Sequence, residues 1–319
     1  MPCYLKEMDF QNLHWGWLAF GPLVLILLAA DLILFHRDPR PVDLKRSLQA
    51  TAGWVALATA FGALILFTLG VHPAMEFFTG YIVELSLSVD NVFVFAVLLR
   101  YFAVPERAQF PALFWGIIGA LFLRAIFIFT GIALINRFHW LIYVFGALLI
   151  YTGIKLLRGG EEKVQPGQNP LVRLARHLMP VTPEFHGSHF FVRDSHHRRW
   201  SATPLFLVLI ALGTTDLVFA IDSIPAILAI TRDPFIVLTS NAFAVLGLRA
   251  LYFAIAGLLK LFAYLNVGLA VILAFIGTKM LLSAWYHLPI PITLGFVLAV
   301  LTISILASIL RPPTKGHAG

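Results

Sequence analysis

The chain has 319 residues, of which 60% are apolar and only 12% are charged, and its mean hydropathy is +0.87. This composition excludes an ordinary soluble globular protein and indicates a polytopic membrane protein. The formal net charge of +7 is accounted for by basic loops, so no nucleic-acid partner is expected. The single cysteine, Cys3, excludes an internal disulfide and a thiolate cluster for a soft metal.

Nine segments are apolar enough to be transmembrane helices, each of which needs about 20 residues. They cover residues 16–35, 51–70, 76–99, 111–134, 138–157, 203–230, 235–257, 261–284 and 289–310. The first segment is interpreted as a helix rather than a signal peptide, because no clearly basic stretch precedes it. The predicted fold class is therefore all-α, with about nine transmembrane helices in the lipid bilayer.

Basic residues gather in the loops on one side of the predicted membrane. The loop after the first span holds four of them and the long loop after the fifth holds eight. The opposite set of loops and ends carries only Lys6, Arg137 and Arg232. Because Lys and Arg are enriched in loops that stay in the cytoplasm, the N-terminus is predicted outside and the C-terminus inside.

Two of the apolar segments carry the same acidic pattern. Glu84 and Asp90 stand six positions apart in the third span, and Asp216 and Asp222 have the same spacing in the sixth. Carboxylates at membrane depth are costly, and they usually face an interior cavity and mark an ion pathway. The matched pairs therefore predict a cation site.

The similarity between the two regions continues beyond the acidic residues. Leu121-Phe-Leu-Arg124-Ala-Ile-Phe matches Leu246-Gly-Leu-Arg249-Ala-Leu-Tyr, and Gly153-Ile-Lys155-Leu-Leu matches Gly277-Thr-Lys279-Met-Leu. Each unit holds three helices, an odd number, so the second unit must cross the membrane upside down relative to the first. This pattern predicts a three-plus-three inverted repeat, an architecture common in secondary transporters.

The repeat also divides the chain. We expect an N-terminal helix pair over 1–75, the first repeat over 76–157, a cytoplasmic loop over 158–202, the second repeat over 203–284, and a last helix with a cytoplasmic tail over 285–319. Several prolines in the loop predict an irregular connector. Its histidines, which include His186 and His189, could bind a metal or simply be solvated.

Helix geometry separates the two carboxylates of each motif. Six residues turn a helix by about 600°, which leaves Glu84 and Asp90 about 120° apart in azimuth. Glu84, Ser88 and Asn91 share one face, and Asp216, Ala220 and Ser223 are their counterparts. One carboxylate could thus face a central site and the other a second partner. Alternatively, Pro225 breaks the sixth span and frees carbonyl ligands, or it makes a simple kink.

The polar groups at membrane depth are nearly all oxygen donors, which suit Mg²⁺, Ca²⁺ and Mn²⁺. The predicted metal ligands are Glu84, Asp90, Asn91, Asp216, Asp222 and Ser223, with Ser88, Thr215, Arg124, Asn241 and Arg249 in support. Four carboxylates against two arginines leave two negative charges, the charge that one divalent cation balances. Protons would replace the departing ion, which makes cation–proton exchange a coupling hypothesis. In the alternative, Arg124, Arg249 and Lys279 neutralise the acids permanently.

These residues resemble a known family. The segments Ser86-Leu-Ser-Val-Asp90-Asn91-Val-Phe, Asp216-Leu-Val-Phe-Ala-Ile-Asp222-Ser223-Ile-Pro225-Ala, Thr239-Ser-Asn241 and Leu246-Gly-Leu-Arg249-Ala-Leu-Tyr-Phe are similar to those of the TerC family of integral membrane proteins. The resemblance implies a bacterial inner-membrane protein of nine spans, named for tellurium resistance and associated with manganese export. The second half also fits the manganese-exporting branch called Alx. Leu85 and Gly213 depart from the family pattern, which often has Lys and Glu there, so one charge is missing from each half.

Three functions compete at this stage. The favoured one is a secondary transporter that exports a hard divalent cation, above all Mn²⁺, with no cofactor other than the transported ion. The second is a membrane scaffold in a tellurite or metal stress resistance complex, with partner proteins or further copies of the chain. The third is an intramembrane aspartyl hydrolase that uses Asp90 and Asp222, but no Gly-x-Gly-Asp element flanks them. We therefore expect the protein not to be an enzyme.

Overall fold

The computed structural model describes residues 10–36, 44–158, 169–193, 200–255, 264–283, 285 and 288–310. Within these ranges it is an all-α membrane protein, and six helices are long and apolar enough to cross a membrane. Three shorter apolar helices lie where the first, fifth and eighth spans are predicted. The count of nine spans stays a prediction, because the apolar stretches of these three helices have only 10 to 17 residues within the described part of the chain.

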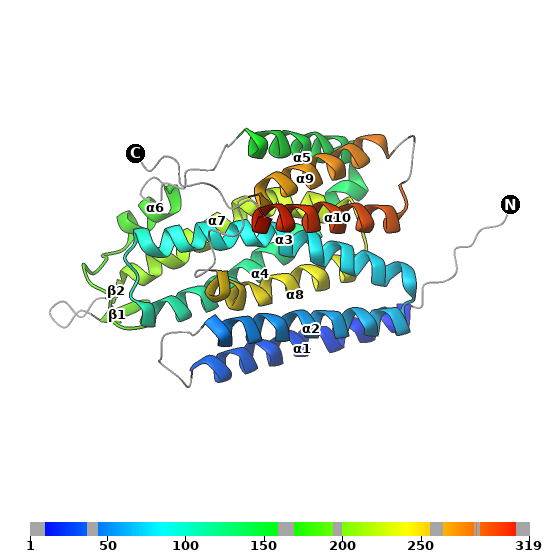
Figure 1. Cartoon of the computed structure of the whole chain (residues 1–319). Coiled ribbons are helices and arrows are strands. Elements are labelled where there is room, and N and C mark those ends of the chain that lie inside the picture. The colour runs from blue at the N-terminus through cyan, green and yellow to red at the C-terminus, as the bar shows by residue number, and fades with distance from the viewer. Residues whose placement is uncertain are drawn as a thin grey trace.

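Ten helices and two short strands make up the described chain (Figure 1). The helices are α1 (Phe10–His36), α2 (Leu44–Thr68), α3 (Val71–Tyr101), α4 (Glu106–Arg137), α5 (Leu141–Leu157), α6 (Pro170–Leu178), α7 (Pro204–Leu228), α8 (Pro234–Ile255), α9 (Leu265–Leu282) and α10 (Ile290–Leu310); the strands are β1 (Phe191–Arg193) and β2 (Trp200–Ala202). The long helices lie side by side, with α6, β1 and β2 at one end of the molecule.

The central helices pack in crossed pairs. α3 packs on α8, α4 on α7, and α5 on α9. The end of α3 and the start of α7 share an apolar cluster, at Leu98 and Leu205, so these two helices run in opposite directions. A twofold axis that exchanges α3–α4–α5 with α7–α8–α9 would produce this set of contacts. The packing favours the inverted repeat, which stays a prediction.

The contacts where α5 crosses α9 are also consistent with this twofold axis. A Cβ atom on Gly277 would lie 2.6 Å from the carbonyl oxygen of Gly146, and one on Gly153 would lie 2.8 Å from that of Ala270. The sequence alignment of the repeats equates Gly153 with Gly277 and Gly146 with Ala270, so it exchanges the two contacts. Glycine is needed here because the two backbones approach each other closely.

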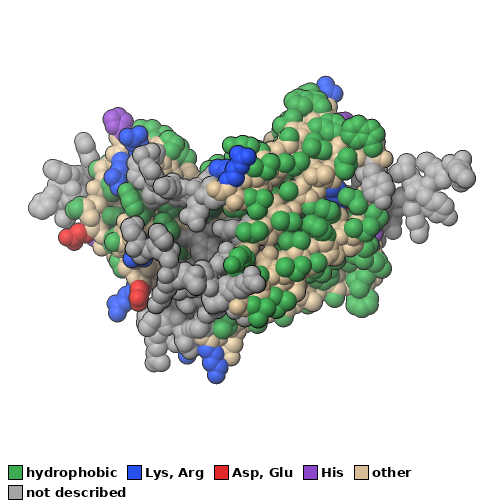
Figure 2. Space-filling view, turned by 45° about the horizontal axis from the view of Figure 1, so that its top comes forward, with side chains coloured by type: hydrophobic (Ala, Val, Ile, Leu, Met, Phe, Trp, Pro, Cys, Tyr) green, Lys and Arg blue, Asp and Glu red, His purple; other side chains and the backbone are tan. Residues whose placement is uncertain are grey.

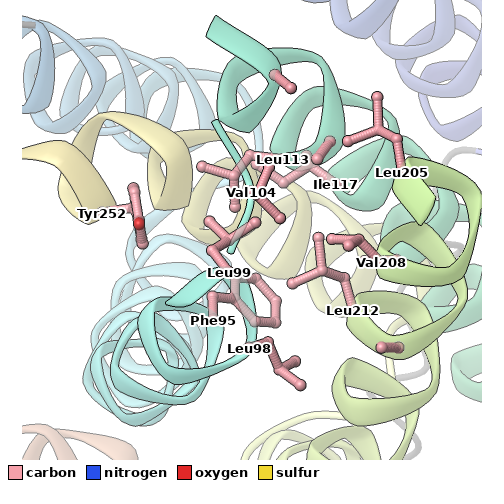
Figure 3. Packing of buried hydrophobic residues seen from close by; sticks show 14 of the residues in the cluster. Phe95, Leu98, Leu99, Val104, Leu113, Ile117, Leu205, Val208, Leu212 and Tyr252 are labelled. Atoms are coloured by element: carbon pink, nitrogen blue, oxygen red, sulfur yellow. The ribbon is translucent and has the colours of Figure 1, made fainter. Parts of the chain in front are cut away.

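Two groups of apolar side chains fill the bundle on either side of its middle. Toward the end that carries α6, residues of α3, α4, α7 and α8 pack together, including Phe95, Leu113, Val208 and Tyr252 (Figure 3). Toward the other end, a second cluster joins α4, α7 and α8: Ile128, Ile132, Ile135, Ala220, Ile224, Ile227, Leu228 and Val237. α8 is the most enclosed span, with 89% of its most apolar stretch buried, against 17% for α2.

The loop predicted as an irregular connector contains regular structure. α6 begins at Pro170, where proline is tolerated because the first amide of a helix has no partner within the helix. The side chain of Asn169 caps α6 by accepting hydrogen bonds from the amides of Leu171 and Val172. β1 and β2 then pair antiparallel. In Figure 2, hydrophobic side chains gather on the right half of the visible face, and the acidic and several basic side chains lie at its left end.

Candidate ion site in the bundle core

Arg124 of α4 is the centre of a buried polar cluster. Its Nε and Nη2 each donate to a carboxylate oxygen of Asp216 at 3.0 Å, and its Nη1 donates to Glu84. Nη1 also lies 3.4 Å from the hydroxyl oxygen of Ser223 and 3.4 Å from the amide oxygen of Asn241. One guanidinium thus connects α3, α7 and α8, and all five residues are at most 2% exposed.

The cluster lies at the level where the apolar packing is interrupted. Asp216 stands at the middle of α7, and Arg124 lies between Ile117 and Ile128 on α4. Ile117 belongs to the apolar cluster on one side, and Ile128 belongs to the one on the other. The polar groups are therefore closed off from both ends of the bundle by hydrophobic side chains.

The buried cluster has more carboxylates than cations, and some of its polar atoms have no hydrogen-bond partner among the described residues. Two carboxylates share one guanidinium, which leaves one negative charge if both are ionised. Among the described residues, Glu84 Oε2, Ser88 Oγ and Asn241 Nδ2 are buried and have no hydrogen-bond partner. Buried polar atoms normally have partners, so this part of the cluster is suited to bind a further polar species.

Asp222 faces a different helix from Asp216, as the azimuth of the two positions requires. It is half-buried, and its Oδ1 accepts a hydrogen bond of 2.9 Å from the hydroxyl of Thr152 in α5. Its neighbour Ser223 instead lies against Arg124. α7 therefore presents one carboxylate to the core cluster and the other toward α5.

The repeat counterpart of Arg124 lies over an aromatic ring. Arg249 of α8 is buried, and its guanidinium carbon lies 4.3 Å from the ring centroid of Phe110 at the start of α4. A cation over an aromatic face is attracted by the ring quadrupole, more strongly where water is excluded. The aromatic ring of Phe110 is thus one of the neighbours that stabilise the buried guanidinium of Arg249.

The structure also locates the remaining residues that the sequence singled out, except for the side chain of Asp90. Asn91 and Thr215 are buried, at 2% and 9% exposure. The side chain of Asp90 lies outside the described residues, and its role stays a prediction. Lys279 donates to the hydroxyl of Thr293 in α10 at 3.1 Å. Pro225 lies near the end of α7, which runs as one helix through it.

Among the residues that the structure describes, no cluster of typical metal ligands is found. Where the structure describes the chain, no three His, Cys, Asp or Glu side chains come together in a way that could hold a metal. Glu84 and Asp216 meet through Arg124, and Asp222 faces α5. The assignment of these residues as metal ligands therefore stays a prediction.

Sequence reasoning missed two residues that touch the site region. Thr152, the partner of Asp222, has an isoleucine as its repeat counterpart, so the repeat gave no sign of it. Asn169 donates from its side-chain amide to the hydroxyl of Thr214 at 2.7 Å, two residues before Asp216. A polar residue before a Pro-initiated helix is a recognisable cap, but its contact with α7 depends on tertiary structure.

Comparison with known proteins identifies the family. Residues 69–315 match the family described as "Integral membrane protein TerC family". The chain is 46% identical over 295 residues to "Uncharacterized membrane protein STKORF319" of Myxococcus xanthus, an alignment that covers 92% of each chain. It is 45% identical over 297 residues to "Putative membrane-bound redox modulator Alx" of Escherichia coli K12, which covers 90% of this chain and 92% of the relative. No solved structure is significantly similar. The chain therefore belongs to the TerC family of integral membrane proteins.

Proposed function

We propose that this protein is a secondary transporter that exports a hard divalent cation, above all Mn²⁺, in exchange for protons. The observation that carries the proposal is the buried cluster of Glu84, Asp216, Ser223 and Asn241 around Arg124, closed on both sides by apolar packing. A polar site enclosed at the middle of a helical bundle is the arrangement that alternating access requires.

Arg124 would act as a tethered cation in this cycle. It compensates the carboxylates when no metal is bound, because leaving them uncompensated in the apolar interior is costly. A divalent ion that enters the site would bind one of the two carboxylates in place of Arg124. Glu84 is more available than Asp216, since only one of its oxygens contacts Arg124. Asp216 would stay with Arg124, because its two hydrogen bonds hold it in the stronger, bidentate geometry.

The donor set supports a hard ion. Ser88 and Asn91, on the same face of α3 as Glu84, and Ser223 and Asn241, next to Arg124, are buried and carry hydroxyl and amide oxygens. Mn²⁺ accepts such ligands, whereas zinc and copper sites usually recruit imidazole or thiolate. Mg²⁺ retains its waters more strongly and demands a near-ideal octahedron, so a site that strips water would favour Mn²⁺. Asp90 and Asp222 would complete the pathway on either side of the core.

Transport by the purified protein in proteoliposomes tests the proposal. We expect Mn²⁺ uptake that alkalinises the lumen, because protons leave as the ion enters, and that is lost in Glu84→Gln and Asp222→Asn. Glu106→Gln, an exposed carboxylate at the start of α4, is the matched control and should transport normally. If zinc or magnesium moves and Mn²⁺ does not, the ion assignment is wrong. If no metal moves, a scaffold role in a resistance complex becomes the better reading.

A further inference from the structure

α6 has three distinct faces. Taking each residue as about 100° of turn, Leu171, Leu174 and Leu178 fall within about 60° of one another. These leucines are 47%, 49% and 70% exposed. Arg173, Arg176 and His177 lie on the far side of the helix and are exposed too. A helix with this segregation of apolar and basic side chains is typical of the membrane interface.

The third face fixes α6 against the membrane-spanning bundle. Val172 is 2% exposed and packs in the apolar cluster that also contains Leu205 and Val208 of α7. The Asn169 side chain is bonded to Thr214, ten residues into α7. α6 therefore lies along the first turns of a transmembrane helix, with its leucine face on one side and its basic face on the other.

A cavity of about 820 Å³ adjoins the basic face of α6. It is lined by Arg176 together with Tyr101 and Phe102 at the end of α3, Pro204 and Leu207 of α7, the segment from Met179 to Pro183, and Phe185. This volume is in the range that holds a small organic ligand or headgroup. Its lining combines one cation with aromatic and aliphatic side chains, which is the chemistry of an anionic amphiphile.

We propose that α6 and this cavity form a binding site for an anionic phospholipid of the adjoining leaflet. The phosphate would lie against Arg176, and an acyl chain would lie along the apolar lining of the cavity at Phe102, Pro204 and Leu207, while the leucine face of α6 lies in the bilayer interface. Charge complementarity favours this occupant, because residues 169–193 contain three arginines and one acid, Glu184. A juxtamembrane cluster of this kind attracts anionic lipid. The proposal does not depend on which ion, if any, the protein transports.

Native mass spectrometry of the full-length protein tests the site, with phosphatidylglycerol and phosphatidylcholine supplied in equal amounts. We expect preferential retention of phosphatidylglycerol, reduced roughly fivefold by Arg176→Gln, the effect of one interfacial charge. Arg137 is an exposed arginine at the C-terminal end of α4, away from α6. The Arg137→Gln variant is therefore the matched control and should retain the lipid normally. Equal retention of both lipids, or an unchanged Arg176→Gln variant, would overturn the proposal. Displacement by inorganic phosphate would mean that the site binds free phosphate instead.

A second measurement keeps all arginines intact. In a Cys3→Ser background, spin labels are attached at Leu174→Cys and His177→Cys, and the protein is placed in bilayers. The two labels should differ in their accessibility to oxygen and to a water-soluble relaxing agent. The label at 174 should meet oxygen, which concentrates in the acyl region, and the label at 177 should meet a water-soluble nickel chelate. If both positions are equally accessible to the chelate, α6 does not lie in the interface and the lipid site is wrong.

Discussion

Arg124 and Asp216 join the middles of α4 and α7 through two parallel hydrogen bonds, from Nε and Nη2, each 3.0 Å long. Such a fork geometry fixes direction as well as distance, which a lysine could not do. Because Glu84 of α3 shares the same guanidinium, the pair also ties the two acidic motifs of the sequence to each other. Arg124 of α4 thus links α7 and α3 through their carboxylates.

The first prediction concerns the stability of this cluster. Arg124→Gln should lower the free energy of unfolding by about 3 to 5 kcal/mol, because it leaves two buried carboxylates without their cation. Protein abundance in membranes and thermal unfolding in detergent would measure the loss. Arg137→Gln, an exposed change at the end of the same helix, should stay within about 0.5 kcal/mol.

The double variant Arg124→Gln/Asp216→Asn distinguishes pairing from simple loss of packing. Removing both partners should destabilise less than the sum of the single changes, since the coupled pair is deleted together. Additive losses would mean that the two side chains do not interact energetically, and would contradict the hydrogen-bonded geometry.

The second prediction concerns Thr152 as a positioning residue for Asp222. Thr152→Val removes the hydroxyl that donates to the carboxylate, while keeping the shape of the side chain. We expect a stability change of only about 1 kcal/mol but a clear fall in metal transport, because Asp222 loses its orientation. Thr152→Ser keeps the donor and should transport normally. Equal transport by the valine and serine variants would show that this hydrogen bond has no role in the pathway.

The third prediction tests the close crossing of α5 and α9. Gly277→Ala places a methyl group where Gly146 O would be 2.6 Å away, so we expect destabilisation of about 1 to 3 kcal/mol. Gly295→Ala in α10, where nothing lies within 4 Å, is the matched control and should be neutral or slightly stabilising. Thermal unfolding of both variants measures the difference. If Gly277→Ala is as stable as the control, the two helices are not in backbone contact.

The fourth prediction concerns orientation in the membrane. In a Cys3→Ser background, Arg232→Cys just before α8 should react with an impermeant thiol reagent in intact cells, since it lies on the side predicted to be outside. Arg173→Cys on α6 should react only after permeabilisation. Both positions are exposed, so access to the reagent depends on the side of the membrane alone. Labelling of position 173 in intact cells would reverse the predicted topology.

The sequence by itself determined that this is a helical membrane protein, and it drew attention to the charged residues within the apolar segments. Apolar runs of about 20 residues in a chain with 12% charge have few alternatives, because a lipid-exposed backbone must satisfy its own hydrogen bonds. The cost of charge at membrane depth also pointed to Glu84, Asp216 and Arg124 before any contact was known. Helix periodicity separated Asp222 from Asp216, and the structure places them toward different neighbours.

Only the tertiary structure decided how these groups are paired. Glu84 and Asp216 lie 132 positions apart, and no local rule assigns one arginine to both, since the two arginines of the repeat are equivalent in sequence. The contact between Thr152 and Asp222, and the position of α6 along α7, depend on which helices become neighbours. Helix packing, rather than the residues taken singly, determines those long-range contacts, because side chains distant in sequence meet only when their helices do.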